Sequence, residues 1–344
     1  MSFERVGIFK DRQGAFTAVG AVLAYGDSTT WRRTPEEGRK HDSACAYRVF
    51  SDGRGGIVFN WRESVFAVWF DGVEWSSLSK RAKREYEARM LEARREAEEL
   101  ERRRHERAAA VARAIWSECA PAVTVGHAYL RRKGVRPVDN LGVLDAESVG
   151  RIVQELTGER WRQVNPKTRN PLSGPLLVVP CFRGGKTDEI SSLEFIAEDG
   201  GKTCLKGGRT KGAFWVPANL ESTDGPLCIA EGIATALSVS QVLRVPCVAG
   251  RSCGNLEDVA RWLWARFPGR KIVVFGDRGN GEAQAAKAAE SIGAALVVPN
   301  FDALTPGGET VRAAFARLCP GVEPTDFNDF YLATGQLYGA YRYD

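Results

Sequence analysis

The sequence predicts an α/β protein whose C-terminal part is a parallel β-sheet with helices on both faces. Three observations lead to this fold class. From residue 227 onward, short apolar runs of strand length alternate with segments of helical periodicity. Residues 79–118 are rich in strong helix formers and contain neither Gly nor Pro. The first 78 residues hold short runs of β-branched and aromatic residues separated by Gly, Asp and Ser.

The chain has 344 residues, enough for two or three domains, and we divide it into four parts. Residues 1–78 are predicted to form a small β-rich domain, and residues 79–118 a long charged helix. Residues 119–222 are predicted to form a basic α+β lobe. Residues 223–344 complete the chain with the parallel sheet, which carries the candidate metal ligands.

The composition argues against a membrane-spanning or secreted protein. The hydrophobic share is 44% with a mean hydropathy of −0.27, and no apolar run reaches the length of about 18 residues that spans a bilayer. The first residues lack the apolar segment of a signal peptide. The 8 cysteines stand singly, without a C-x-x-C pair. We therefore expect reduced thiols, a cytoplasmic location and no zinc module.

The net charge of +5 is unevenly distributed along the chain. Residues 223–344 contain 11 Lys and Arg against 13 Asp and Glu, and the first 222 residues contain the other 37 and 30. A basic front part and a slightly acidic rear part are typical of a chain that binds a polyanion with one part and acts on it with another.

Four runs in the β-rich domain predict strands, at residues 6–9, 16–19, 47–50 and 56–61. The glycine-rich residues 51–56 predict a hairpin turn, because Gly adopts positive φ readily. Aromatic and basic residues are interleaved here, a pattern that fits either stacking on single-stranded nucleic acid or core tryptophans beside solvated arginines. Both interpretations stay open for Trp31, Trp61, Trp69 and Trp75 with Arg32, Arg33, Arg54 and Arg62.

The charged segment is predicted to be one continuous helix, about 55 Å long over residues 79–116 at 1.5 Å per residue. Glu85 and Arg89 form an i,i+4 pair in the favourable order. Apolar residues are too sparse for a coiled coil, so we interpret the helix as a solvated spacer. Its basic cluster at residues 102–105 is an alternative phosphate contact.

The basic lobe is predicted to contain a short helix ending near residue 134 and strands at 175–180 and 190–196. A glycine-rich stretch over residues 200–212 follows. Backbone without side chains can approach phosphate closely, and cations beside it can bind the charge. This stretch carries Lys202, Lys206, Arg209 and Lys211.

Carboxylates follow two predicted strands of the C-terminal sheet. Glu231 comes after residues 227–230, and Asp277 after residues 271–276; Asp326 and Asp329 lie near the C-terminus. Ligands bind beyond the carboxyl ends of parallel strands, and clustered carboxylates are ligands that Mg²⁺ prefers. Taken singly, Asp277 as a turn residue and Asp326 as a helix N-cap explain the pattern too. Taken together, the carboxylates favour a metal site.

These carboxylates lie in an ordered set of motifs: Ile229-Ala-Glu-Gly-Ile-Ala-Thr-Ala-Leu, Val274-Phe-Gly-Asp-Arg-Gly-Asn-Gly and Asp326-Phe-Asn-Asp. The set resembles the motifs of the Toprim domain, and more specifically those of plasmid- and phage-borne Toprim DNA primases. Segments at residues 55–62, 127–135 and 176–208 resemble the same proteins, so the resemblance covers most of the chain. It implies a Toprim-like sheet preceded by a primase-like lobe.

The resemblance implies a DNA primase that makes short RNA primers on single-stranded DNA by metal-dependent nucleotidyl transfer. Its substrates would be nucleoside triphosphates, and its partners the replication proteins of a plasmid or phage. The implied ligands of Mg²⁺ or Mn²⁺ are Glu231, Asp277, Asp326 and Asp329, with Glu231 also a general acid/base. The residues implied to bind nucleotide or DNA are Lys202, Lys206, Arg209, Lys211, Arg131, Arg132 and Lys133.

Two departures from the family pattern stand out. Where the family usually has a further acidic or amide residue after the first Asp, this chain reads Asp277-Arg278-Gly279. One metal contact is therefore either missing or supplied by Asn280, Glu282 or Asp329. In addition, no zinc module precedes the catalytic part, so residues 1–75 would have to recognise the template in another way.

Other functions fit the sequence less well. Residues 184–187 resemble the end of a P-loop, but Pro180 stands where its first Gly belongs. Residues 276–281 have the spacing G-x-x-G-x-G, which differs from that of a dinucleotide-binding loop. The alternatives that remain are a non-catalytic single-stranded-DNA-binding protein derived from a Toprim primase, and a Toprim nuclease.

Overall fold

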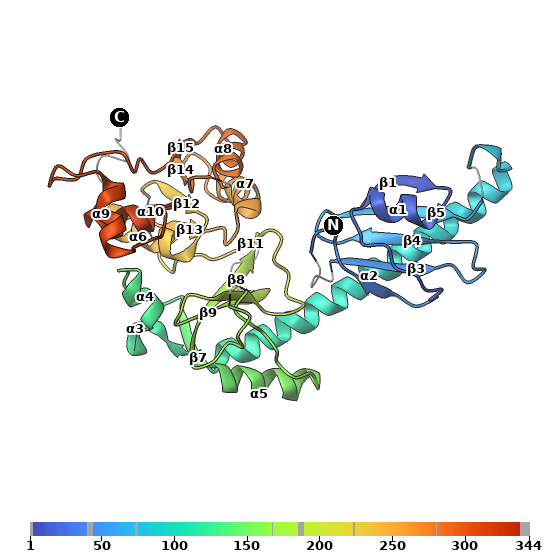
Figure 1. The fold of residues 1–344 in the computed structure, drawn as a ribbon, viewed down its shortest axis with the longest axis horizontal. Coiled ribbons are helices and arrows are strands. Elements are labelled where there is room, and N and C mark those ends of the chain that lie inside the picture. The colour runs from blue at the N-terminus through green and yellow to red at the C-terminus, as the bar shows by residue number, and fades with distance from the viewer. Residues whose placement is uncertain are drawn as a thin grey trace. The chain divides into compact units, whose positions relative to one another are not determined.

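The computed structural model describes residues 3–39, 44–72, 75–166, 168–184, 189–222, 224–279 and 281–337. The chain forms two compact units, residues 1–102 and 103–344 (Figure 1). Helix α2 (Lys80–Ser117) crosses the boundary and contributes to both units. No helix among the described residues is long and apolar enough to cross a membrane.

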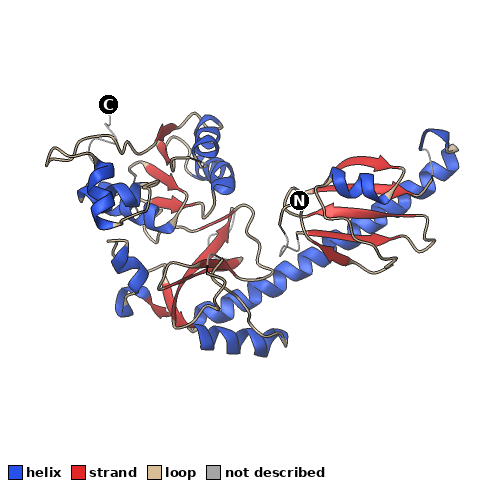
Figure 2. Cartoon of the chain, viewed as in Figure 1, coloured by secondary structure: helices blue, strands red, loops and turns tan. Residues whose placement is uncertain are grey.

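The first unit is a five-stranded sheet with a helix on each face (Figure 2). Strands β1 and β5 pair in parallel, and the other neighbours are antiparallel. The N-terminal half of α2 covers one face, and α1 (Arg12–Ala18) covers the other. The strand order is β1-β5-β4-β3-β2, with β1 Glu4–Phe9, β2 Arg32–Thr34, β3 Cys45–Val49, β4 Gly55–Asn60 and β5 Val65–Phe70.

Helix α1 corrects one prediction, because residues 16–19 lie in and just after this helix and not in a strand. The side chain of Asp11 accepts a 2.7 Å hydrogen bond from Gly14 N and so caps the helix. Phe16 then enters the core from the helix, with 1% of its surface exposed. The predicted hairpin is confirmed: β3 and β4 are antiparallel neighbours, and Gly53 in their turn has φ +68°.

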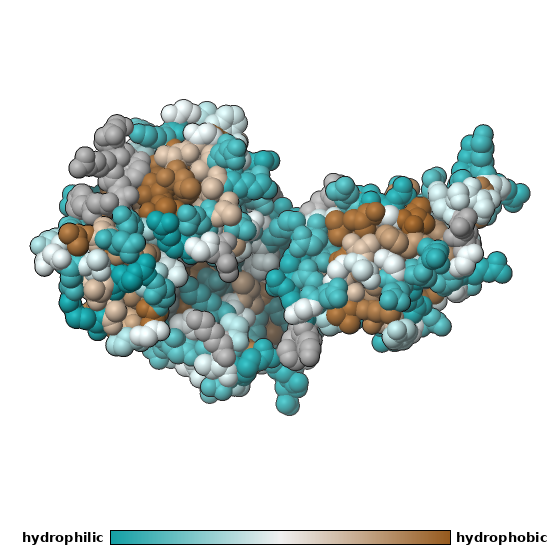
Figure 3. Space-filling view, turned by 45° about the horizontal axis from the view of Figure 1, so that its top comes forward, coloured by the Kyte–Doolittle hydropathy of each residue, from teal (hydrophilic) through white to brown (hydrophobic). Residues whose placement is uncertain are grey.

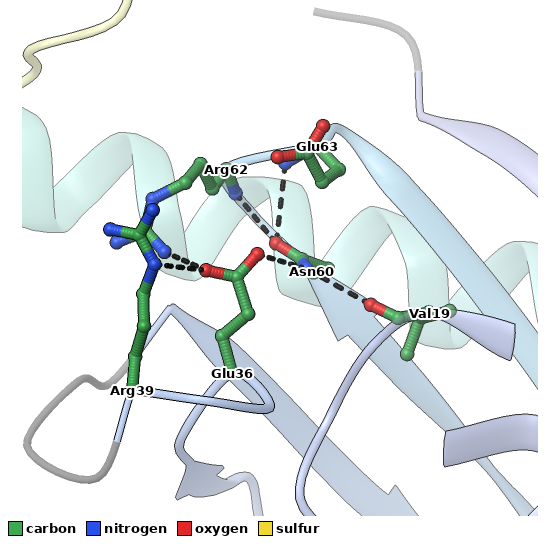
Figure 4. A network of polar contacts seen from close by, with 6 residues as sticks. All are labelled: Val19, Glu36, Arg39, Asn60, Arg62 and Glu63. Atoms are coloured by element: carbon green, nitrogen blue, oxygen red, sulfur yellow. Dashed lines mark hydrogen bonds and ion pairs between the residues drawn. The ribbon is translucent and has the colours of Figure 1, made fainter. Parts of the chain in front are cut away.

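Asn60 organises a polar network at the end of β4 (Figure 4). It is 1% exposed, and its amide nitrogen donates to Val19 O at 3.0 Å and to Glu36 Oε1 at 3.2 Å. Its Oδ1 accepts from the backbone N–H groups of Arg62 and Glu63. Both the amide nitrogen and the amide oxygen of Asn60 therefore have hydrogen-bond partners within the fold.

The tryptophans of the first unit belong mainly to its core. Trp69 is fully buried, whereas Trp31, Trp61 and Trp75 are partly buried and pack against the same core. Arg48 lies over Trp31 and pairs with Glu96 of α2. Template binding by this unit stays a prediction, but Trp69 is not available for it. On the face drawn in Figure 3, hydrophobic side chains gather in patches over this unit.

Helix α2 is a packed element, so its interpretation as a solvated spacer is wrong. Met90, Ala93 and Ala97 are buried in the core of the first unit. Farther along, three other residues are buried in the second unit: Val111, Ala112 and Ile115. Alanine contributes little to a hydrophobic periodicity, yet its small side chain lets a helix lie close against a sheet.

The second unit contains two sheets. The first has the order β10-β9-β8-β7-β6 and is antiparallel. Its strands are β6 Ala120–Pro121, β7 Gly142–Asp145, β8 Pro175–Arg183, β9 Ser192–Ala197 and β10 Lys202–Cys204, and β11 Ala213–Phe214 pairs with β8. Its helices are α3 Ala122–Val125, α4 Ala128–Arg132 and α5 Ala146–Thr157.

The other sheet is wholly parallel, with the order β13-β12-β14-β15, as the alternation predicted. Helices α7 and α8 pack on one face, and α6, α9 and α10 on the other. Its strands are β12 Leu227–Ala230, β13 Cys247–Ala249, β14 Ile272–Phe275 and β15 Ala295–Val297. The helices are α6 Ile233–Leu243, α7 Leu256–Arg266, α8 Glu282–Glu290, α9 Val311–Leu318 and α10 Phe327–Thr334, with a short 3-10 turn at Cys253–Asn255. A further 3-10 turn, Trp75–Ser77, belongs to the first unit.

Candidate functional site

Two of the predicted carboxylates lie at the same edge of the parallel sheet. Glu231 directly follows β12, and Asp277 follows β14 after one glycine. These strands are parallel neighbours, with Ala230 opposite Phe275, so their carboxyl ends meet. Gly281 lies between the two side chains: a Cβ there would stand 3.0 Å from Glu231 Oε2 and 3.6 Å from Asp277 Cβ. A glycine is thus needed for this close approach.

The segment before α10 brings the other two carboxylates to the same place. Arg278 N donates a 2.8 Å hydrogen bond to Thr325 O, which ties the loop after β14 to this segment. Asp326 caps α10 by accepting from Asp329 N at 2.8 Å, and Asp329 Oδ2 accepts from Thr325 N at 3.0 Å. Asp326 is therefore the N-cap that the sequence allowed, and it also lies in the carboxylate cluster.

The pKa directions show that these carboxylates act on one another. Burial, with repulsion by Asp326, Glu231 and Asp329, raises the pKa of Asp277 to about 8. Burial and repulsion by Asp329 raise the pKa of Asp326, and burial raises that of Glu231. Carboxylates whose pKa values are raised together by burial and mutual repulsion indicate a candidate functional site. We call Glu231, Asp277, Asp326 and Asp329 the carboxylate cluster.

Two lysines of the basic lobe lie at this cluster. Lys133 Nζ is 3.4 Å from Asp329 Oδ1. Lys202 lies 5.3 Å from the ring of Tyr129, and its charge lowers the pKa values of Glu231, Asp277 and Asp326. Burial lowers the pKa of Lys202, but attraction by Tyr129, Glu194 and Asp326 outweighs it, so the net shift is upward. Asn328, which is fully buried, fixes the arrangement by donating to Lys133 O at 2.7 Å and Ser238 Oγ at 2.9 Å.

The other predicted nucleotide- or DNA-binding residues lie on exposed or partly exposed parts of the lobe. Arg131 and Arg132 end α4, and Arg132 donates to Glu198 O and lies 5.7 Å from the Tyr129 ring. Lys206 is exposed and pairs with Glu159 at 3.2 Å. Lys211 is exposed, and Arg209 is partly buried.

The C-terminal part of α2 extends this basic region. It lies beside the glycine-rich stretch, although the two segments are about 100 residues apart in the sequence. His105 Nδ1 lies 3.0 Å from Gly207 O, and a Cβ on Gly207 would stand 3.5 Å from Arg104 Cγ. Arg107 donates to Thr157 O at 2.6 Å. The alternative phosphate contact predicted for residues 102–105 therefore lies partly beside the glycine-rich stretch. We call Arg104, Arg107, Lys206, Arg209 and Lys211 the basic surface.

Sequence reasoning missed a second charged pair close to the carboxylate cluster. Arg251 follows β13, and its side chain is 3% exposed. It lies 3.6 Å from Glu194 Oε1 of β9 and donates to Cys204 Sγ at 3.0 Å. Glu194 is the only charged residue within β9, among Ser, Leu, Phe, Ile and Ala, and this was the signal available in the sequence.

The cluster fits a divalent cation by its chemistry. Asp277 Oδ1 is buried and has no hydrogen-bond partner in the described part of the chain, and it is surrounded by three further carboxylates. Oxygen ligands of this kind suit Mg²⁺ or Mn²⁺. Among the described residues, however, no three His, Cys, Asp or Glu side chains are arranged as a ready-made ligand set.

Two predicted features, Asn280 and residues 185–187 of the P-loop-like segment, lie outside the described residues.

A parallel sheet with clustered carboxylates at its carboxyl edge defines the class of this domain. Residues 226–336 match the Toprim domain family, so this part of the chain is a Toprim domain. The predicted fold class, with its parallel sheet and helices on both faces, is thereby confirmed.

The similar proteins agree with the resemblance that the motifs indicated. The chain is 27% identical over 217 residues to one DNA primase TraC of Escherichia coli, a match that covers 57% of the chain and 20% of the relative. It is 30% identical over 161 residues to another DNA primase TraC of Escherichia coli, covering 43% of the chain and 11% of the relative. The chain thus spans about a fifth or less of the length of these curated relatives. The resemblance to Toprim DNA primases of plasmid or phage type is confirmed.

Two solved structures are similar over part of the chain. One contains the bacteriophage T7 lagging-strand DNA polymerase interacting with primase domains bound to an RNA/DNA hybrid and dTTP. The match has 16% sequence identity and a TM-score of 0.30, and it covers 38% of this chain and 67% of the chain in that structure. The other is the primase fragment of the bacteriophage T7 primase-helicase protein, with 16% identity, a TM-score of 0.28, and coverage of 36% and 53%.

Proposed function

We propose that this chain is a DNA primase that makes short RNA primers on single-stranded DNA by metal-dependent nucleotidyl transfer. The observation that carries the proposal is the convergence of four carboxylates and two lysines at the carboxyl edge of a Toprim sheet. The similarity to DNA primase TraC supports the same activity. Phosphoryl transfer needs mainly positioning and charge neutralisation, which such a cluster supplies when it holds a cation.

In this proposal the carboxylate cluster holds Mg²⁺ or Mn²⁺. When bound there, the ion would neutralise charge on the transferring phosphoryl group. The 3′ oxygen of the growing primer attacks the α-phosphorus of the incoming nucleoside triphosphate, and the bond to the departing pyrophosphate breaks. A carboxylate oxygen of Glu231 accepts the proton of the attacking hydroxyl, because burial raises the pKa of this group toward the working range of a base.

The cations of the lobe have separate roles in the proposal. Lys202 binds the phosphates of the incoming triphosphate, since it is the lysine of the glycine-rich stretch whose charge acts on Asp277 and Asp326. Lys133 holds Asp329 in place through their 3.4 Å ion pair. The basic surface binds the phosphates of the template strand, which would give affinity without sequence preference. Arg131 and Arg132, at the end of α4, would contribute further contacts to nucleotide or template phosphates.

The test is incorporation of labelled nucleoside triphosphates on single-stranded DNA in the presence of Mg²⁺ or Mn²⁺. We expect short RNA products from the full chain. Asp277→Asn should remove the products, whereas Asp139→Asn, the same change at an exposed position outside the cluster, should leave them. DNA binding without incorporation would establish the alternative of a non-catalytic binding protein. Shortening of the labelled DNA itself would establish a Toprim nuclease.

The non-catalytic alternative is favoured by one observation. No ready-made metal ligand set is present among the described residues, and Gly279 stands where the family usually has a further ligand. Direct titration of the metal-free protein with Mn²⁺ separates the two functions. A primase should bind the ion at the carboxylate cluster, so that Asp277→Asn weakens binding, whereas a binding protein should show no difference between this variant and the wild type.

A further inference from the structure

Arg251 connects the two sheets of the second unit beside the carboxylate cluster. Its backbone has φ +64°, a left-handed conformation that costs about 1 kcal/mol or more for a residue with a side chain. Its backbone N–H donates to Glu231 O at 2.7 Å, and the preceding N–H of Gly250 donates to Ala230 O at 2.8 Å. The main chain of Arg251 is therefore fixed directly to Glu231, the residue that follows β12.

The side chain of Arg251 extends in the opposite direction, to the antiparallel sheet. It lies 3.6 Å from Glu194 Oε1 and 3.0 Å from Cys204 Sγ, and its Nε is buried without a partner in the described structure. Both charged side chains are nearly excluded from water, at 3% and 11% exposure. Buried charges are costly, and replacing such a pair by apolar residues is often neutral or stabilising, so stability alone does not explain this one.

Glu194 lies between two cations. In the β9–β10 ladder Cys204 is opposite Glu194 and Lys202 is opposite Ile196, so all four side chains lie on one face of the sheet. Glu194 attracts the charges of both Arg251 and Lys202. Lys202 is attracted on its other side by Asp326 of the carboxylate cluster. The Lys202 ammonium, which lies 5.3 Å from the Tyr129 ring, is thus attracted both by Glu194 and by the cluster.

We propose that Arg251 is a positioning residue, which pairs with Glu194 and thereby leaves Lys202 directed at the carboxylate cluster. The proposal rests on the proposed function, in which Lys202 binds the triphosphate. Without the Arg251 charge, Glu194 would be a buried carboxylate without its ion-pair partner, and Lys202 lies on the same face of the sheet and is attracted by it. Lys202 would then move away from the cluster.

Displacement of Lys202 has opposite effects on two ligands. A metal ion at the carboxylate cluster is repelled by the Lys202 ammonium, so moving the lysine away should tighten metal binding. A triphosphate is attracted by the same ammonium, so its binding should weaken. A merely structural role for Arg251 would loosen the site and weaken both ligands together.

The experiment compares Arg251→Met with the double variant Arg251→Met/Glu194→Gln. Met keeps the Cβ and an unbranched apolar stem in place of the charged side chain, so the strain at φ +64° is unchanged. Mn²⁺ binding to the metal-free full chain and ATP binding at saturating Mg²⁺ are both measured by calorimetry. For Arg251→Met we expect Mn²⁺ binding about 3-fold tighter and ATP binding about 10-fold weaker, on the scale of a single charge at intermediate dielectric.

The double variant removes the unpaired carboxylate and should return both affinities to within about 2-fold of the wild type. It also guards against misfolding, because it replaces the ion pair by two neutral groups of similar volume. Parallel losses of Mn²⁺ and ATP affinity in Arg251→Met, or unchanged values for both ligands, would overturn the proposal. Failure of the proposed function is a separate outcome, seen as the absence of primer synthesis by a wild-type chain that still binds both ligands.

Discussion

Two buried polar side chains, one in each unit of this protein, have different surroundings. In the first unit, Asn60 donates to Val19 O and Glu36 and accepts from two backbone N–H groups, so its polar atoms are satisfied within the fold. In the second unit, Asp277 Oδ1 is buried without a partner and faces other carboxylates. The first arrangement stabilises its unit, whereas the second costs stability and is completed only by a ligand.

The same contrast holds for charged residues. Arg48 and Arg33 of the first unit pair with Glu96 and Glu101 of α2 at its surface. Arg251 of the second unit is buried with Glu194 at a longer distance of 3.6 Å, beside the carboxylate cluster. Arg48 Nε is also buried without a hydrogen-bond partner among the described residues, so incomplete pairing alone does not indicate a functional site. What distinguishes the Arg251–Glu194 pair is its position beside a cluster of carboxylates with raised pKa values.

The largest expected effect is on catalysis, from Asp277→Asn. We expect primer synthesis to fall by about 10³-fold or more, because the change removes a charged oxygen where charge develops in phosphoryl transfer. Affinity for single-stranded DNA should stay within about 3-fold, because the basic surface is untouched. Synthesis is measured by labelled nucleotide incorporation and affinity by fluorescence anisotropy. Wild-type synthesis in this variant would remove Asp277 from the site.

The same variant should raise the stability of the metal-free protein. The pKa of Asp277 is about 8 in the fold, against 3.8 ordinarily, so the folded chain binds the extra proton and loses stability as pH rises from about 4 to 8. Asp277→Asn removes this loss. Its Tm in chelator should therefore exceed that of the wild type by more at pH 8 than at pH 5. A Tm difference between variant and wild type that is equal at both pH values would contradict the interpretation of Asp277 as an unpaired buried carboxylate. Adding Mg²⁺ should reduce this Tm difference.

A second comparison concerns α2, which supplies core residues to both units. A fragment of residues 103–344 keeps Val111, Ala112 and Ile115, whereas one of residues 119–344 loses them all. Removing three buried apolar side chains costs several kcal/mol, on the order of half of a typical domain stability. We expect the longer fragment to unfold cooperatively and the shorter one to lack a cooperative transition in urea. Equal transitions would show that the helix is dispensable.

Asn60→Ala should have the effect opposite to that of Asp277→Asn. Truncation leaves Val19 O, two backbone N–H groups and Glu36 without their partner, at a cost of about 2 kcal/mol. We expect a lower midpoint in urea for the first unit and unchanged Mn²⁺ binding at the carboxylate cluster. Asn219→Ala, at an exposed position, is the control and should change neither. An unchanged midpoint for Asn60→Ala would show that the network is not stabilising.

The predictability of each region follows from how local its determinants are. The parallel sheet was found because its strands β12, β13 and β14 are buried on both faces and read as apolar runs. Helix α1 was missed because Phe16 and its neighbours have β propensity, and the Asp11 cap decides the conformation. The carboxylates were found by their position after strands. The Arg251–Glu194 pair was not, because it forms between two sheets and only the fold brings it together.

The smallest expected effect concerns the basic surface and is a change in salt dependence. Binding of single-stranded DNA releases counterions, so the logarithm of the affinity falls with that of the salt concentration by about 0.7 for each neutralised phosphate. Replacing Lys206, Arg209 and Lys211 together by Ala should reduce this slope by about 2 if each contacts one phosphate.

The matched control removes three exposed charges elsewhere in the second unit, by replacing Arg261, Arg266 and Lys287 of α7 and α8 with Ala. Both triple variants lower the net charge equally, so a general electrostatic effect would change both slopes alike. A slope that falls only for the basic surface places the template beside the glycine-rich stretch and the end of α2. An unchanged slope there would instead direct attention to the arginines of the first unit, where Trp31 and Trp61 are partly exposed.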